Sequence, residues 1–88
     1  MGETAVGSVQ SPEYDQLLKL LRRTREEAGV SQRELSRRLG KASSYIGKIE
    51  AGTRRLDVVE LIRLLKVLGR DLSGFLNEYT KSLTVHER

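Results

Sequence analysis

Few side chains in this sequence could carry out covalent or metal chemistry, and their types exclude most enzymatic sites. His86 is the only histidine and there is no cysteine. Neither a zinc site nor a histidine-based nucleophile–base pair can therefore be assembled. A glycine-rich phosphate cradle is also missing from the sequence. We expect no enzyme, no metal and no cofactor.

Short polar and cationic side chains gather instead in the segment SSYIGK at residues 43–48. Ile46 and Ile49, three residues apart, give a helix one apolar side. The opposite side is then small, polar and positive, which is the form of a helix that enters the major groove of DNA. The candidates for contacting base edges are Ser43, Ser44, Tyr45, Gly47 and Lys48.

The residues alone leave three of these assignments open. Ser43 could cap the helix instead of reading a base. Tyr45 could stack along the sugar-phosphate backbone, or it could cover the edge of the core. Gly47 costs roughly 1 kcal/mol relative to alanine inside a helix, and either close approach to DNA or a tolerant position would explain it.

Positive charge concentrates around the same segment. Seven basic and two acidic residues lie between positions 33 and 55, a balance of +5 where the whole chain has +4. A charge run alone usually marks a solvated face, but one that coincides with a reading helix is typical of nucleic-acid binding. The expected phosphate contacts are Gln32, at the positive end of its helix, and the cations Arg38, Lys41, Arg54 and Arg55.

Two short helices separated by a glycine must position these side chains. Ser31 is a natural N-cap, and Glu34 stands where it would complete a capping box. Leu35 and Leu39 share one face of the helix that follows. Gly40 ends that helix, since glycine adopts the left-handed conformation of a C-terminal turn at no steric cost.

Three more helices are expected, which makes the fold all-α with five helices. The first is predicted at residues 13–28 with Ser11 as its cap. The second begins after the cap Asp57 and runs to about residue 68, and the third begins after the cap Asp71 and runs to about residue 83. The second of these is apolar round most of its circumference, which predicts a central position. Residues 1–12 are expected to be a disordered arm, residues 13–83 the folded domain, and residues 84–88 a frayed tail.

The composition also bounds the location of the protein. No apolar run approaches the eighteen or so residues of a membrane span, and the N-terminus lacks the basic start and apolar core of a signal peptide. Without cysteine, nothing indicates an oxidising compartment. We expect a soluble cytoplasmic protein with no membrane contact.

The run from Leu21 to Leu76 resembles the Cro and lambda-repressor type of helix-turn-helix domain, the XRE family. The matching segments are LRRTREEAGVSQREL, the Gly40 turn, YIGKIEAGTRR and LIRLLKVLG. The resemblance implies five helices around one core, with the second and third forming the unit that reads double-stranded DNA. It also implies that Arg25 on the first helix pairs with Glu50, an inward carboxylate that needs a cation.

Two hypotheses of function follow. The leading one is a homodimeric transcriptional regulator, a repressor or autoregulator, on a palindromic operator, because one helix per subunit reads too few base pairs. Apolar residues beyond the needs of the core, Leu76, Tyr79 and Leu83, are the predicted dimer contact. The alternative is a protein-binding module, such as an antitoxin that engages a partner protein.

Overall fold

The computed structural model describes the backbone of residues 11–87 and the side chains of residues 11–83. This part of the chain forms five helices and no strand, which confirms the all-α class. The helices are α1 (Pro12–Glu27), α2 (Gln32–Arg38), α3 (Tyr45–Glu50), α4 (Val58–Val67) and α5 (Leu72–Glu87). The arm expected at residues 1–12 lies outside the described residues, apart from Ser11 and Pro12, which belong to the start of α1.

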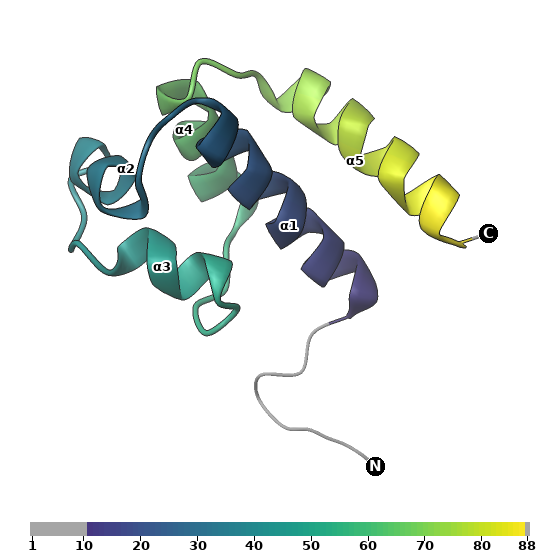
Figure 1. Ribbon diagram of the computed structural model, residues 1–88, viewed down its shortest axis with the longest axis horizontal. Helices are drawn as coiled ribbons and strands as arrows, with labels where there is room; N and C mark the ends of the chain where they lie inside the picture. The colour runs from purple at the N-terminus through teal and green to yellow at the C-terminus, as the bar shows by residue number, and fades with distance from the viewer. Residues whose placement is uncertain (1–10, 88) are drawn as a thin grey trace, which may run out of the picture.

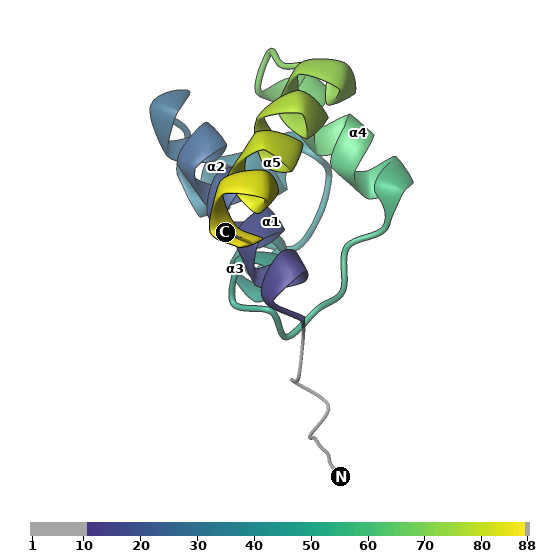
Figure 2. The ribbon, with the colours of Figure 1, turned by 90° about the vertical axis from the view of Figure 1, so that its right-hand side faces the viewer.

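Helix α1 holds the other elements together. It contacts α3 on one side and α5 on the other, and α5 runs beside it (Figure 1). The view along the other direction places α2 and α4 to either side of α5 (Figure 2). The α2–α3 pair stands at the end of the molecule opposite the C-terminal end of α5 (Figure 1).

One cluster of buried apolar side chains joins all five helices. Ile46 and Ile49 of α3 are 1% and 0% exposed, so the apolar side of this short helix is wholly turned inward. The cluster consists of Leu18, Leu20, Leu21, Leu35, Tyr45, Ile46, Ile49, Leu61, Leu64, Leu65, Leu68 and Phe75. Because the isoleucines are buried, the opposite side of α3 must face away from the protein.

Helix α4 is less central than its apolar pattern predicts. Leu64 and Leu65 are buried, but Val58, Val59 and Ile62 are 59%, 50% and 43% exposed. The expectation of burial on most sides was wrong, because α4 contacts α2 and α5 and leaves one apolar side uncovered.

The starts of α1, α2, α4 and α5 follow local capping rules, and α3 is the helix between residues 11 and 87 whose N-cap side chain makes no capping hydrogen bond. Ser31 accepts a hydrogen bond from the backbone N–H of Glu34 at 3.0 Å, as predicted. The Glu34 carboxylate, however, accepts from Arg37 and Arg38 at 2.7 and 2.8 Å, so the predicted capping box on α2 was wrong. The box is found on α4, between Asp57 and Glu60.

The helix ends differ from expectation at one place. Gly40 has a φ of 70° and ends α2 in the left-handed region, as expected. Helix α5 continues to Glu87, beyond the end at about residue 83 that the sequence predicted, and the fraying of residues 84–88 stays a prediction. None of the helices between residues 11 and 87 has the length and apolar character that crossing a membrane requires.

Candidate nucleic-acid interface

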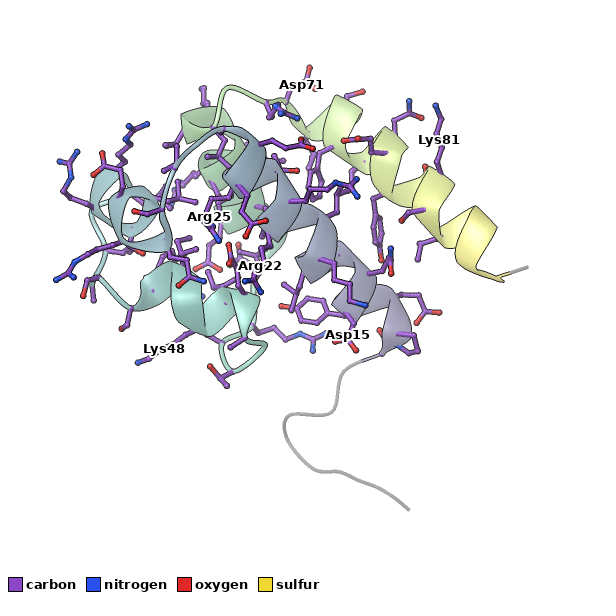
Figure 3. The ribbon with its side chains drawn as sticks, in the orientation of Figure 1. Asp15, Arg22, Arg25, Lys48, Asp71 and Lys81 are labelled. Atoms are coloured by element: carbon purple, nitrogen blue, oxygen red, sulfur yellow. The ribbon has the colours of Figure 1, made fainter. Side chains whose placement is uncertain are left out.

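The outward side of α3 is formed by side chains that the protein itself does not use. Ser44 occupies the N-cap position, but its side chain makes no capping hydrogen bond. Ser43 and Ser44 are both exposed, and within residues 11–83 neither hydroxyl has a hydrogen-bond partner. Lys48 is exposed and points away from the other helices (Figure 3). These three groups are free to contact a ligand outside the protein.

A buried hydroxyl on α2 takes over the capping of α3. The Oγ of Ser36 is fully buried, donates to the carbonyl of Gln32 at 2.8 Å, and accepts from the backbone N–H of Ile46 at 3.1 Å. The N–H groups in the first turn of a helix have no partner within the helix. Ser36 therefore satisfies one of them and ties the start of α3 to α2.

Replacing Ser36 with alanine should lower the free energy of unfolding by about 1–3 kcal/mol, because the N–H of Ile46 would stay buried without a partner. Urea unfolding followed by circular dichroism measures this change. Ser43→Ala is the matched control and should change stability by no more than about 0.5 kcal/mol. Equal midpoints for Ser36→Ala and the wild type would show that this hydrogen bond contributes nothing.

Tyr45 belongs to the core and does not project with the serines. It is 9% exposed, and burial raises the pKa of its hydroxyl. The Nζ of Lys41 and the guanidinium carbon of Arg54 lie 5.4 and 4.9 Å from the centre of its ring. Of the two interpretations that the sequence left open, the structure supports the one in which Tyr45 covers the core, and the assignment as a base-reading residue is corrected.

The four cations expected at phosphates fall into two groups. Arg38 binds Glu34 at 2.8 Å, and Arg54 binds both carboxylate oxygens of Glu60 at 3.2 and 2.9 Å. Lys41 and Arg55 have no carboxylate partner within residues 11–83; Arg55 lies over the ring of Tyr14 at 4.4 Å.

Of these four cations, Arg55 and Lys41 are therefore the two whose charge is not neutralised by a carboxylate within residues 11–83. Arg54 is held in place over Tyr45 because its guanidinium donates two hydrogen bonds to Glu60 and one to the carbonyl of Arg55. Glu60 was missed at the sequence level, although its position three residues after Asp57 is the signature of a capping box.

Glu60 makes the stability of the domain depend on pH in the acid range. Its hydrogen bonds with Arg54 hold the pKa of the Glu60 carboxyl at about 2, below its usual range. A carboxyl whose pKa is lower in the folded state stabilises the protein above its unfolded pKa, and this contribution is lost as the pH falls toward the folded pKa.

Glu60→Gln should therefore flatten the fall in stability between about pH 4.5 and about pH 2. Thermal unfolding recorded across this range measures the effect. Glu78→Gln, on exposed α5, serves as control and should follow the wild-type curve. An identical acid profile for Glu60→Gln and wild type would contradict the role given to the Arg54–Glu60 pair.

A buried polar network fixes the C-terminal half of α3. The guanidinium of Arg25 donates to both oxygens of Glu50 at 2.7 and 3.1 Å and to the carbonyl of Val30 at 2.8 Å. The side chains of this ion pair are 8% and 4% exposed. The bond to Glu50 raises the pKa of Arg25. The pair that the family resemblance implied is thus present, and it joins α1 to α3.

Gln32 also enters this network. Its amide Nε2 donates to Glu50 at 2.8 Å, which engages one of its two N–H groups inside the protein, and its contact with a phosphate stays a prediction. Its Oε1 lies 3.3 Å from the place that a Cβ would take on Gly47. Glycine at this position therefore leaves room for Gln32 to cross from α2 to α3, a reason that the sequence alone did not indicate.

Of the residues predicted at a dimer contact, Leu76 is the most exposed, at 38%. Tyr79 packs against the core and donates its hydroxyl to the carbonyl of Glu13 at 2.7 Å, and Leu83 is half-buried. Tyr79 therefore serves to fasten α5 to α1. Larger apolar surface lies on α4, at the exposed side chains that the sequence placed in the core.

An exposed α3 that is held against α2 and flanked by unpaired cations defines a DNA-binding protein of the helix-turn-helix class. The chain belongs to the helix-turn-helix family HTH_3, of XRE type, whose model matches residues 21–75. This membership makes the protein a DNA-binding transcriptional regulator.

Solved structures agree on the fold. A crystal structure of the clp gene regulator ClgR from Corynebacterium glutamicum superposes with a TM-score of 0.74 at 23% identity, covering 90% of this chain and 84% of that one. A second ClgR structure from the same organism has a TM-score of 0.70 at 24% identity, with 84% and 95% covered. At these identities the likeness concerns the fold. A search of curated protein sequences found no match.

Proposed function

We propose that this protein reads a short inverted-repeat operator as a homodimer and acts there as a repressor or autoregulator of transcription. The observation that carries the proposal is the outward side of α3, where Ser43, Ser44 and Lys48 are exposed and have no partner within residues 11–83. Groups of this kind are suited to the base edges of the major groove.

Each exposed group has a distinct role in this proposal. Lys48 donates to O6 or N7 of a guanine, and the two serine hydroxyls donate or accept and so discriminate less between bases. Lys41 and Arg55 contact phosphates, which positions the helix without reading sequence. Arg54 is held by Glu60 and by the carbonyl of Arg55, which fixes the loop after α3.

The homodimer follows from the small number of bases that one α3 can contact. Two copies related by a two-fold axis read two half-sites about 34 Å apart, or a multiple of that distance. The face that we assign to the contact consists of Val58, Val59 and Ile62 of α4 and Leu76 of α5, all of which are exposed apolar residues. A groove of about 330 Å³ between α1, α4 and α5 includes Val58 and Leu76 in its wall and joins the two helices into one surface.

Selection of bound duplexes from a random library tests this function directly. We expect an inverted repeat, and we expect Lys48→Ala to relax the preference at one position of each half-site at a cost of about 1–3 kcal/mol. Arg55→Ala should weaken binding to all sequences alike. It should also reduce the salt slope, which is the slope of the logarithm of the binding constant against the logarithm of the salt concentration, by about one unit for each bound subunit.

The matched control is Lys81→Ala, because Lys81 lies on α5 and points away from the α3 side (Figure 3). It should leave both base preference and salt slope unchanged. Recovery of sequences without symmetry would reject the homodimer on an inverted repeat, and no enrichment at all would favour the alternative of a protein-binding module.

A further inference from the structure

The peptide groups around Arg55 are held by side chains rather than by regular secondary structure. Arg55 lies in the loop between α3 and α4. Its carbonyl accepts a hydrogen bond from the guanidinium of Arg54 at 2.9 Å. The N–H of the next residue, Leu56, donates to the hydroxyl of Tyr14 at 3.1 Å. Tyr14 belongs to α1 and precedes Leu56 by 42 residues, so this bond ties the loop to an element that is distant in the sequence.

The ring of the same tyrosine contacts the Arg55 side chain. The guanidinium carbon of Arg55 lies 4.4 Å from the centre of the Tyr14 ring, within the range of a cation–π contact. Such a stack occupies the flat face of a guanidinium, whereas its N–H donors point outward in the plane of the group. Arg55 is exposed and has no carboxylate partner within residues 11–83, so these donors can bind a phosphate while the stack persists.

Tyr14 is itself fixed, as a support for the loop must be. It is the third residue of α1, and its backbone N–H donates to the capping hydroxyl of Ser11 at 3.0 Å. Its side chain is half-buried and packs against the core. The loop therefore rests on a helix start that both capping and core packing hold in place.

Neither core packing nor the family pattern accounts for a tyrosine at this position. Packing against the core uses the ring, which a phenylalanine would supply equally well. The hydroxyl is used in the bond to the loop. Residue 14 also precedes residues 21–75, the segment that the HTH_3 model matches. The contacts with Arg55 and Leu56 are the ones that use both the aromatic ring and the hydroxyl.

We propose that Tyr14 is a positioning residue for Arg55: its hydroxyl holds the backbone and its ring holds the guanidinium before DNA is bound. This inference rests on the proposed function, in which Arg55 contacts a phosphate. Ordering a long side chain at an interface lowers affinity, and a side chain that is ordered in advance avoids part of this cost. Tyr14 then strengthens DNA binding without contacting the duplex.

Nuclear magnetic resonance of the free protein tests the positioning without DNA. An aromatic ring shifts the resonances of protons above its face upfield. The Cδ protons of Arg55 should therefore be shifted upfield in the wild type and in Tyr14→Phe, and this shift should be lost in Tyr14→Leu. Arg55 protons at ordinary chemical shifts in the wild type would overturn the inference.

A double-mutant cycle tests whether Tyr14 acts through Arg55. Anisotropy measures binding to a fluorescein-labelled inverted-repeat duplex recovered by the selection. Tyr14→Leu should weaken binding about 3- to 10-fold for each bound subunit, and Tyr14→Phe, which keeps the ring, should weaken it less. In the Arg55→Ala background, Tyr14→Leu should cause no further loss.

The Lys48→Ala background is the matched control, because Lys48 contacts DNA in the proposed function but does not touch Tyr14. There, Tyr14→Leu should cause its full loss again. Circular dichroism checks that each variant is folded. Equal losses in the wild-type, Arg55→Ala and Lys48→Ala backgrounds would assign Tyr14 to folding or dimerisation and overturn the inference, as would unchanged affinity in Tyr14→Leu. A wild-type protein that binds no duplex would reject the proposed function, and this inference with it.

Discussion

Replacing Glu50 with alanine should lower the free energy of unfolding by about 3–5 kcal/mol, the largest single-residue effect that we expect on stability. Arg25 would remain almost buried, at 8% side-chain exposure, with no carboxylate to neutralise it. Gln32 would lose its acceptor as well. The free energy of unfolding of a small domain is about 5–15 kcal/mol in total, so the Glu50→Ala variant should be close to the limit at which the domain still folds. Urea unfolding provides the measurement.

A double-mutant cycle separates the ion pair from its surroundings. Arg25→Met and Glu50→Met should each destabilise the domain strongly, whereas the double variant should cost much less than their sum, because no charge then remains buried. Glu78→Ala is the matched control, since Glu78 is an exposed glutamate of α5, and its effect should stay within about 0.5 kcal/mol. Additive effects of the two methionine changes would contradict the coupling.

Replacing Ile62 with glutamate should convert the proposed dimer to a monomer and weaken binding to a full inverted repeat at least roughly 30-fold, as expected for a central interface residue. Ile62 is 43% exposed within one subunit, so the change should leave the monomer folded. In the dimer, the same position would bury an unpaired carboxylate among apolar side chains, at a high cost. Analytical ultracentrifugation at tens of micromolar and binding to full and half operators measure the two effects.

Asn77→Glu adds the same charge at an exposed position of α5 and should leave the dimer intact. A dimer that persists in Ile62→Glu would move the contact to another face. A wild-type protein that is monomeric both alone and on DNA would reject the homodimer. The apolar side of α4 would then be better explained by a partner protein, which is the alternative considered from the sequence.

The fold could be predicted because its main signals are local. Ser11, Ser31, Asp57 and Asp71 each accept a hydrogen bond from a backbone N–H three residues later. A cap and its partner are always neighbours in the chain, so their spacing is visible in the sequence. The three-residue spacing of Ile46 and Ile49 likewise determined which side of α3 is buried, and hence that the serines and Lys48 face outward.

The candidate site was predicted less completely. The exposure of Ser43, Ser44 and Lys48 agrees with the expected reading side of α3. The burial of Tyr45 and the internal hydrogen bond of Gln32 were not predicted, because their neighbours come from other parts of the chain. Gln32 donates to a carboxylate 18 residues away, and a contact over this separation leaves no periodic pattern in the sequence.

The sequence by itself determined the class of the protein: five capped helices, a two-helix reading unit and an excess of positive charge around it. The tertiary structure decided which cations remain available, since Arg54 is neutralised by Glu60 while Arg55 and Arg33 lack a carboxylate partner within residues 11–83. It also decided that one apolar side of α4 stays exposed. The physical reason is that charged and apolar side chains find their partners on elements that are distant in the sequence. Helix caps and the apolar spacing of a helix depend only on residues that are neighbours in the chain.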